Sequence, residues 1–392
     1  MDARYLNDEE LQKELSRCLQ CAAKPCLKAC PVKCSPYDFI KAAKSKDWKT
    51  AASHISEHNP LGEICGLVCP DKFCVQYCVR AQVDKAIAIP AVQASIMKKN
   101  REINQNPSVQ NIKANGKKVA VIGFGPAGMG AASKLLANGF SVTVFEKEKI
   151  FGGALNLIPS YRLPREVVQY ECQKFMQNPL FEVRFSTMIT DYGKLLQEGF
   201  AAVIATVGEQ KKRELKIKGA EFAIDYNDYL ANREKYRTQG AVAVIGGGST
   251  AVDCAVCASL SGASAVEMFV RRGAENMRIT AEEKQILMKY GIKVSNFTRP
   301  AEIIKNNDEF TLLTLKTCFD KDGNLQDVND CPNHNGEWKY IIKALGNVRD
   351  KEPENKQGIY YAGDYVNGSS TVVEAIASGK KVAEEIINKY AD

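Results

Sequence analysis

The sequence has no long hydrophobic run. Across its 392 residues, no apolar stretch approaches the ~18 to 20 residues that a membrane-spanning helix needs. Its first residues, MDARYLNDEELQKELSRC, are polar and helix-like, and they lack the apolar centre of a secretory signal. We therefore expect no membrane insertion and a cytoplasmic location, where thiols stay reduced.

Histidine is scarce, since the chain has only His54, His58 and His334. No Ser/His/Asp arrangement is visible, so we expect no side chain to act as a catalytic acid, base or nucleophile. Basic residues form no motif interleaved with aromatics, and Lys+Arg 53 against Asp+Glu 46 leaves a net charge of only +7. A solvated surface explains this excess better than a nucleic-acid interface does.

The remaining composition is that of a folded soluble protein. Hydrophobic residues make up 45% and charged residues 25% of a chain long enough for two or three domains. From Asp8 to about Gln110 the pattern is helical, and the Asn-rich residues 104–118 indicate a linker. The rest predicts two β-turn-α-β units, so the fold class is α/β, an all-α domain followed by two Rossmann-like dinucleotide-binding domains.

Cysteine is concentrated near the N-terminus. Nine of the 14 cysteines lie in residues 18–78. Most form two rows, Cys18-x2-Cys21-x4-Cys26-x3-Cys30-Pro31 and Cys65-x3-Cys69-Pro70-x3-Cys74-x3-Cys78. Zinc sites usually have two Cys-x2-Cys pairs that are far apart, whereas ferredoxin-type segments have short continuous spacings and a Cys-Pro step. We therefore expect two 4Fe-4S clusters, with zinc or inert buried thiols as alternatives; eight ligands are needed, so the count does not select them.

The first β-turn-α-β unit is KKVAVIGFGPAGMGAASKLLANGFSVTVFEKE. Gly123, Gly125 and Gly128 have the G-x-G-x-x-G spacing directly after an apolar strand, and Pro126 and Ala127 complete the turn. These glycines allow a tight turn, close approach to a pyrophosphate and close helix packing. Glu146 ends the next strand, where a carboxylate can accept hydrogen bonds from ribose hydroxyls. The unit predicts a dinucleotide site.

The second unit is AVAVIGGGSTAVDCAVCASLSGASAVEMFVRR, with Gly246, Gly248 and Ala251 in the same register. Ser249 and Thr250 open its helix and could donate to a phosphate. Its second strand ends in Arg271-Arg272 rather than in an acid. Because guanidinium groups bind a 2'-phosphate that a carboxylate would repel, the pair predicts NADPH; the alternative is two arginines on a surface loop.

A Cys-x2-Cys pair, Cys254 and Cys257, lies inside the helix that follows Gly248. In thioredoxin reductases the redox-active pair precedes the second glycine motif. We therefore expect these two cysteines to pack in a helix rather than to exchange electrons.

Together, the cysteine rows and glycine turns resemble the glutamate synthase small subunit family, including the electron-entry half of dihydropyrimidine dehydrogenase, over residues 10–390. The resemblance implies that Cys18, Cys21, Cys26 and Cys78 hold one cluster and that Cys30, Cys69, Cys74 and Gln93 hold the other. Cys34 and Cys65 are then left over. One residue fewer separates Cys69 from Cys74 than in the mammalian-type pattern.

The resemblance also implies that the first unit binds FAD. Further FAD contacts are then expected from Gly152, Gly153, Arg162, Gly363, Asp364 and Thr371, and a third basic contact to NADPH from Arg278. The FAD domain is discontinuous in this arrangement. The expected domains are 1–113 for the clusters, 114–208 with 346–392 for FAD, and 209–345 for NADPH.

The function implied is oxidation of NADPH, with electrons passing through FAD and the clusters to an acceptor. The FMN-binding barrel of dihydropyrimidine dehydrogenase would need ~250 further residues, so we expect it on another polypeptide or absent. The chain is then the electron-input subunit of a larger partner, or a stand-alone oxidoreductase that reduces ferredoxin, quinones, nitro compounds or oxygen. A redox sensor with structural clusters is a third hypothesis, and the chain could form a homo-oligomer.

Overall fold

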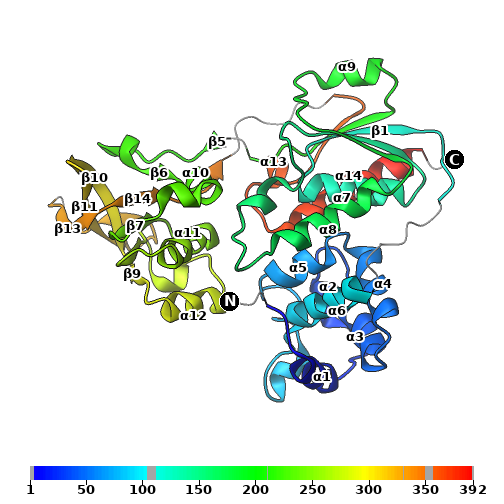
Figure 1. Ribbon diagram of the computed structural model, residues 1–392, viewed down its shortest axis with the longest axis horizontal. Helices are drawn as coiled ribbons and strands as arrows, with labels where there is room; N and C mark the ends of the chain where they lie inside the picture. The colour runs from blue at the N-terminus through cyan, green and yellow to red at the C-terminus, as the bar shows by residue number, and fades with distance from the viewer. Residues whose placement is uncertain (1–3, 104–111, 210, 330, 349–355, 391–392) are drawn as a thin grey trace. The chain divides into compact units, whose positions relative to one another are not determined.

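The computed structural model describes residues 4–103, 112–209, 211–329, 331–348 and 356–390. The chain forms two compact units, of which the first comprises Met1–Asn156, Ser160–Gln210 and Arg349–Asp392, and the second Leu157–Pro159 and Lys211–Val348 (Figure 1). Most of the expected linker, residues 104–111, lies outside the described residues. Among the helices described, none is long and apolar enough to cross a membrane.

The N-terminal part of the first unit, residues 4–103, contains helices and turns but no strand. Its elements are α1 (Asp8–Arg17), α2 (Pro25–Ala29), α3 (Pro36–Lys44), α4 (Trp48–His58), α5 (Gly62–Val68), η1 (Val79–Gln82) and α6 (Ile89–Ile103). The helices α5 and α6 are in close contact, because a Cβ on Gly66 would lie 2.5 Å from the backbone nitrogen of Ala94. Several cysteines sit where helices begin or end: Cys18, Cys30 and Cys69 follow α1, α2 and α5, and Cys78 precedes η1.

A five-stranded parallel sheet forms the rest of the first unit, in the order β16-β4-β1-β2-β3. The strands are β1 (Lys118–Ile122), β2 (Ser141–Phe145), β3 (Phe181–Arg184), β4 (Ala202–Ala205) and β16 (Ile359–Tyr361). The helices are α7 (Pro126–Leu136), η2 (Gly153–Leu157), α8 (Arg165–Met176), α9 (Tyr192–Gln197), α13 (Asp364–Asn367) and α14 (Val372–Lys389). The end of the chain therefore returns to the sheet that β1 begins.

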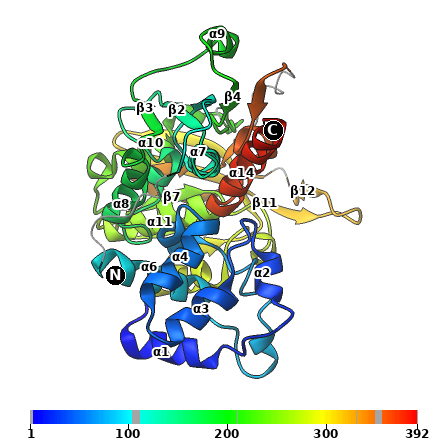
Figure 2. The ribbon, with the colours of Figure 1, turned by 90° about the vertical axis from the view of Figure 1, so that its right-hand side faces the viewer.

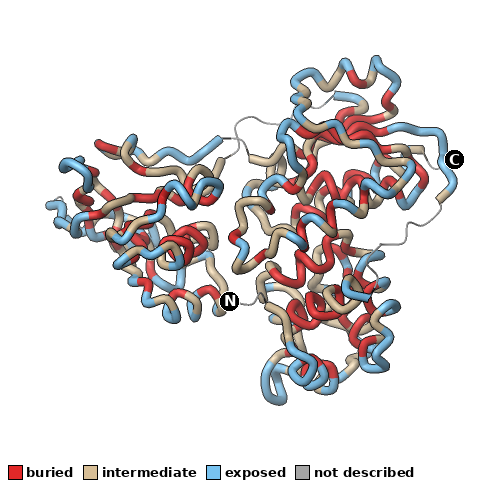
Figure 3. The backbone as a smooth tube through the Cα atoms, in the orientation of Figure 1, coloured by how far each residue is buried: buried red, intermediate tan, exposed pale blue. Residues whose placement is uncertain are grey.

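The central strands of this sheet are buried, as Figure 3 shows, because helices cover them. The closest helix contact joins α7 and α14, which lie side by side in Figure 2. A Cβ on Gly379 of α14 would lie 1.9 Å from the carbonyl oxygen of Ala127, so only glycine fits there. This contact fixes the position of α14 along α7.

The helical part and the sheet of the first unit are joined by buried polar contacts. Glu171 of α8 is fully buried and accepts hydrogen bonds from the backbone N–H groups of Glu63 (2.9 Å) and Ile64 (3.0 Å). These groups open α5, which has no side-chain cap of its own. A carboxylate from the sheet-containing part of the first unit therefore caps the helix that leads to Cys69.

The second unit has its own five-stranded parallel sheet, in the order β6-β14-β7-β8-β9. Its strands are β6 (Ile224–Asp225), β7 (Val242–Ile245), β8 (Val266–Phe269), β9 (Lys293–Ser295) and β14 (Tyr340–Lys343). Its helices are α10 (Tyr226–Ala231), α11 (Ser249–Leu260) and α12 (Ala281–Lys289), with short turns η3 (Ala220–Phe222), η4 (Arg233–Tyr236) and η5 (Ala274–Asn276).

Antiparallel strands, which the sequence did not predict, extend this unit. They are β10 (Thr298–Asn306), β11 (Glu309–Phe319), β12 (Leu325–Asp327) and β13 (Asn333–Trp338), and β11 and β12 are labelled in Figure 2. Ile303, Leu312 and Trp338 pack with Ile245 and Phe269 of the parallel sheet. Short strands β5 (Lys211–Lys212) and β15 (Asn347–Val348) pair at the two ends of the insertion.

Candidate functional site

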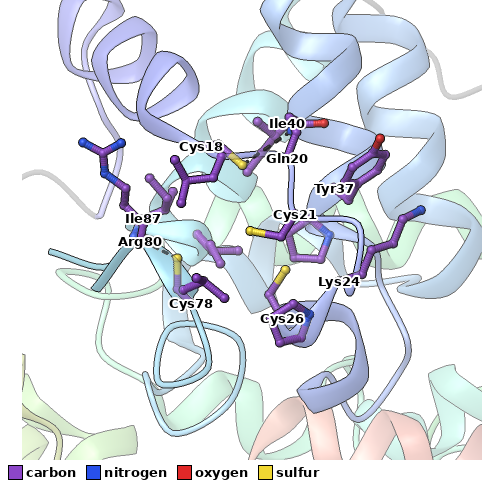
Figure 4. A pocket seen from close by; sticks show the side chains of 15 residues that line it. Cys18, Gln20, Cys21, Lys24, Cys26, Tyr37, Ile40, Cys78, Arg80 and Ile87 are labelled. Atoms are coloured by element: carbon purple, nitrogen blue, oxygen red, sulfur yellow. Dashed lines mark hydrogen bonds between the residues drawn. The ribbon is translucent and has the colours of Figure 1, made fainter. Parts of the chain in front are cut away.

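The first cysteine pocket contains Cys18, Cys21, Cys26 and Cys78. Figure 4 shows their sulfur atoms directed toward one shared space. Cys18 and Cys21 come from the stretch between α1 and α2, Cys26 lies in the first turn of α2, and Cys78 comes from the start of η1, about fifty residues later. The four thiols are those that the resemblance assigns to one cluster.

The second cysteine pocket contains Cys30, Cys69, Cys74 and Gln93, and also Cys65. Gln93 is only 8% exposed, and its Nε2 donates to the carbonyl of Gly62 at 2.7 Å. The amide nitrogen is thus engaged, and Oε1 is the atom that could bind a metal. The Sγ of Cys34, which does not line the pocket, lies 4.0 Å from this Oε1.

The donor set of both pockets fits 4Fe-4S clusters better than single ions. In the described parts of the chain, no three His, Cys, Asp or Glu side chains are placed to share one metal ion. The sulfur atoms instead surround a space, as a multi-iron cluster requires. Burial raises the pKa of Cys26 to about 11 and that of Cys74 to about 12, so without positive ions these thiols stay protonated.

The first glycine turn is packed on two sides and open on one. Gly123 has φ +100°, and a Cβ there would lie 2.8 Å from the carbonyl oxygen of Thr206. A Cβ on Gly128 would lie 2.1 Å from the oxygen of Gly123. At Gly125, which precedes α7, a Cβ would have no neighbour closer than 3.9 Å. The open side is therefore at Gly125, where the N-terminus of α7 faces space in which a pyrophosphate can bind, whereas Ala127 is buried against Gly379 of α14.

Glu146 is held at the end of β2 by the same turn. Its side chain accepts hydrogen bonds from the N–H groups of Phe124 (2.7 Å) and Glu148 (2.9 Å), and the residue is 5% exposed. Each carboxylate oxygen keeps a second acceptor position. The carboxylate is thus oriented to accept hydrogen bonds from ribose hydroxyls.

Two later segments meet this turn. The N–H of Gly152 donates to the carbonyl of Phe124 at 2.9 Å, and a Cβ on Gly153 would lie 3.2 Å from the Cα of Gly125. Gly363 has φ +75°, and its Cβ would lie 2.7 Å from that of Ala127. The structure therefore brings residues 123–128, 152–153 and 363 together.

Three further residues predicted to contact FAD are Asp364, Thr371 and Arg162. Burial raises the pKa of Asp364, and the hydroxyl of Ser370 donates to its carboxylate. Thr371 is the N-cap of α14, where its hydroxyl and the side chain of Glu374 form a capping box. Arg162 is half-buried in the loop before α8.

The second glycine turn, like the first, has one tightly packed glycine and one open glycine. Gly246 has φ +148°, and a Cβ there would lie 2.3 Å from the carbonyl oxygen of Ala344, whereas Gly248 has no neighbour within 4 Å. Thr250 lies in the first turn of α11, and the hydroxyl of Ser249 donates to Glu283 at 3.2 Å. The N–H of Arg278 donates to the carbonyl of Gly247 at 3.1 Å, so Arg278 lies beside the turn.

Arg271 and Arg272 follow β8, and their backbones are fixed by neighbouring strands. The hydroxyl of Thr317 donates to the carbonyl of Arg271 at 2.8 Å, and the N–H of Phe297 to that of Arg272 at 3.2 Å. The Nε of Arg272 is buried and has no hydrogen-bond partner in the part of the chain that the structure describes. A buried unsatisfied guanidinium donor is costly, and an anion would satisfy it.

Arg213, which the sequence analysis did not select, contributes to the same positive region. Partial desolvation lowers the pKa of the Arg271 guanidinium, although the residue is exposed, and the charges of Arg272 and Arg213 lower it further. The backbone N–H of Arg213 donates to Gly346 at 3.1 Å, next to the short β5–β15 pair. No local sequence pattern relates Arg213 to residues almost sixty positions later, so only the fold reveals it.

Cys254 and Cys257 are both buried within α11, at 0% and 3% exposure. Burial raises the pKa of Cys257 to about 11. A reactive cysteine needs an accessible thiolate, and neither residue has one.

Comparison with known proteins gives two family matches. The family described as dihydropyrimidine dehydrogenase domain II, 4Fe-4S cluster, matches residues 2–105. The family described as pyridine nucleotide-disulphide oxidoreductase matches residues 117–379. The boundary between the matches falls in the expected linker.

Among curated proteins, the NAD-dependent dihydropyrimidine dehydrogenase subunit PreT of Escherichia coli (strain K12) is 30% identical, over 95% of this chain and 93% of its own length. The glutamate synthase [NADPH] small chain of Bacillus subtilis (strain 168) is 27% identical, over 97% and 91%. Among solved structures, FprA of Mycobacterium tuberculosis in complex with NADPH matches 70% of this chain and 84% of its own, with a TM-score of 0.57 and 16% identity, which shows a shared fold.

Proposed function

Because the chain belongs to the pyridine nucleotide-disulphide oxidoreductases, in the branch of the dihydropyrimidine dehydrogenase and glutamate synthase small subunits, we propose that it is an electron-input subunit that oxidises NADPH for a separate acceptor protein. The membership confirms the resemblance and the fold class predicted from the sequence. The chain is an NAD(P)-dependent oxidoreductase whose cofactors are FAD and 4Fe-4S clusters.

The observation that carries the proposal is the position of α14. Its N-cap, Thr371, belongs to the segment that closes against the first glycine turn, and Val373, two residues later, lines the second cysteine pocket. One helix start thus joins the FAD-binding part to a cluster-binding pocket within one compact unit. When bound, FAD accepts two electrons as a hydride and releases them singly, which suits one-electron clusters.

Two short segments of the chain each link the first cysteine pocket to the second. Cys26 and Cys30 lie at the two ends of α2, one in each pocket, and Cys74 and Cys78 bridge the pockets again. Val373 of α14 lines the second cysteine pocket, whereas none of the residues that line the first pocket belongs to α14. Within the chain, the two links at Cys26–Cys30 and Cys74–Cys78 connect the second pocket to the first. We infer an electron path from the FAD site to the second pocket, then to the first, and from there to the acceptor.

NADPH is the nucleotide that the second unit supports best. The relatives include both an NAD-dependent and an NADPH enzyme, so family membership alone does not identify the nucleotide. Arg278 lies beside the second glycine turn, and Arg271, Arg272 and Arg213 lie close enough to one another to form one positive region. A buried donor of Arg272 lacks a partner among the described residues. A 2'-phosphate supplies the missing acceptor and charge.

The domain boundaries at residues 113, 208 and 345, and the cytoplasmic location, remain part of this proposal. Most of the second unit, Lys211–Val348, is inserted between β4 and β16, which supports a discontinuous FAD domain. None of the fourteen cysteines, all of which lie in described parts of the chain, forms a disulfide, which fits a reducing compartment.

The partner is tested by purification of the protein from its native cell under anaerobic conditions. An electron-input subunit co-elutes with a larger polypeptide, and addition of NADPH reduces the cofactors of both. A protein that elutes alone and reduces ferredoxin or quinones at the same rate in the absence of any partner would overturn the subunit assignment.

The cluster assignment is tested with two neighbouring cysteines. Cys30→Ala removes a thiol that lines the second cysteine pocket, whereas Cys34→Ala removes one behind it. We expect iron to fall from about eight to about four per chain in the first variant only. Equal iron loss in both would contradict the choice among the nine cysteines.

A further inference from the structure

A lysine of the FAD-covering helix reaches into the cluster-binding part of the first unit. Lys380 lies in α14, and its Nζ donates to the backbone carbonyl of His58 at 2.5 Å. The preceding residue, Gly379, is in contact with the backbone of α7, which fixes the helix at this point. The lysine head is therefore held in one place.

That place is close to the second cysteine pocket. His58 ends α4, and the next residue, Asn59, lines the pocket together with Cys30 and with Val373 of α14. Burial lowers the pKa of Lys380, and the neighbouring thiols of Cys34 and Cys30 act in the opposite direction. Because Lys380 is half-buried, water screens its ammonium charge from the pocket only in part.

The charge of Lys380 is bonded to a carbonyl rather than to a carboxylate. Glu384, one turn later on α14, pairs instead with Lys134 at 2.6 Å. Lys380 itself is in no ion pair among the described residues, although the charges of Lys134 and Glu384 also act on it, in opposite directions. The field of a fixed charge and of nearby donors is one way in which a protein sets the potential of a metal centre.

We propose that Lys380 raises the reduction potential of the cluster in the second cysteine pocket, and thereby favours that cluster as the first acceptor of electrons from the flavin. This inference rests on the proposed electron path. One-electron reduction takes an electron from the reduced flavin and adds one negative charge to the cluster, without a change in its bonds to the protein. A nearby positive charge stabilises that added charge.

The test compares Lys380→Gln and Lys380→Met with wild type by anaerobic redox titration followed by electron paramagnetic resonance. Gln removes the charge but keeps a donor for the His58 carbonyl, and Met removes both. We expect both variants to lower the midpoint of one cluster by at least the ~59 mV that equals a tenfold change in its reduced-to-oxidised ratio. Cys30→Ala, which should lack this cluster, identifies its signal.

Lys380→Arg and Lys381→Met are the matched controls. Arg keeps the charge and should stay near the wild-type midpoint, and Lys381 is exposed on the next position of the same helix. The other cluster should not shift in any variant. Unchanged midpoints in Lys380→Gln with full iron content would overturn the proposal.

Failure of this inference can be distinguished from failure of the proposed function. The titration uses chemical reductant and mediators, so it needs neither NADPH nor a partner. Iron analysis and thermal unfolding of each variant show whether a shift reflects lost clusters or lost packing. A midpoint shift in Lys380→Met but not in Lys380→Gln would assign the effect to the hydrogen bond, and would also contradict the role of the charge.

Discussion

The two glycine turns of this chain have the same local design and different surroundings. In both, a buried parallel strand leads through a glycine with positive φ to an open glycine at the start of a helix. They differ after the next strand: Glu146 directly follows β2 and is buried and bonded to its own turn, whereas β8 is followed by the buried Val270 and then by Arg271, which is exposed among other arginines. The shared backbone suits a pyrophosphate, and the side chains that follow the second strand suit a ribose in the first unit and a 2'-phosphate in the second.

The turns also differ at their third small residue. Gly128 lies where a Cβ would overlap the oxygen of Gly123 at 2.1 Å, but the equivalent residue of the second turn is Ala251, whose Cβ is accommodated. The first helix is therefore packed more closely on its strand than the second. The same motif thus tolerates different residues in its two copies.

The largest effect is expected from Gly128→Ala. The added methyl group must displace backbone rather than a flexible side chain, so α7 moves away from β1 and the pyrophosphate space is lost. We expect a loss of stability of about 3 kcal/mol or more and almost no bound FAD. Flavin absorbance per chain and thermal unfolding measure this change.

Its control is Ala251→Gly in the other turn, which should retain full flavin content and lose only about 1 kcal/mol through helix propensity. Normal FAD binding by Gly128→Ala would mean that the first turn is looser than its contacts indicate.

The next largest effect is expected from removal of the arginine pair. A hydrogen bond to a charged group contributes about 1.5 to 3 kcal/mol, so Arg271→Ala/Arg272→Ala should weaken NADPH by about tenfold to a hundredfold or more. NADH, which lacks the 2'-phosphate, should bind almost as before. Steady-state kinetics with both nucleotides is the measurement.

Arg213→Ala should weaken NADPH in the same direction but less, since no backbone contact of the second turn involves it. Arg237→Ala is the matched control, because Arg237 is 66% exposed and pairs with Glu234. If the double variant keeps its preference for NADPH, the pair is merely a surface feature.

A smaller effect is expected from Glu146→Gln. The two side-chain oxygens accept from two backbone N–H groups, and the amide nitrogen of glutamine cannot replace an acceptor. One lost hydrogen bond of about 1.4 kcal/mol corresponds to about tenfold weaker FAD binding. Titration of the flavin-free protein with FAD measures it, and Glu148→Gln, an exposed neighbour, should bind FAD normally.

The features that sequence predicted are those that local spacing determines. Strand, turn and helix of each nucleotide unit appear within some thirty residues, and the cysteine rows show their chemistry through spacing and proline. The antiparallel strands β10 to β13 were not predicted, because their alternation of buried and exposed residues within an α/β unit gives no local boundary.

The features that sequence missed depend on contacts between distant segments. Arg213 reaches the arginine pair only because β5 pairs with β15, and Glu171 caps α5 only because α8 packs there. Cys65, expected to be left over, lines the second cysteine pocket because α5 turns it inward. Each of these residues looks ordinary within its own segment.

The smallest effect is expected from Cys254→Ala, which makes the second helix more like the first. Counted from the open glycines, Cys254 of α11 corresponds to Ala131 of α7, and both residues are fully buried. If the cysteine only packs, alanine loses about 1 to 2 kcal/mol of stability through a small cavity and leaves NADPH oxidation unchanged. Ala131→Cys, the reverse exchange, should overfill the more closely packed helix and cost more. Loss of turnover in Cys254→Ala with normal FAD and iron would instead give the Cys254–Cys257 pair a redox role, and the two helices would then differ in chemistry as well as in packing.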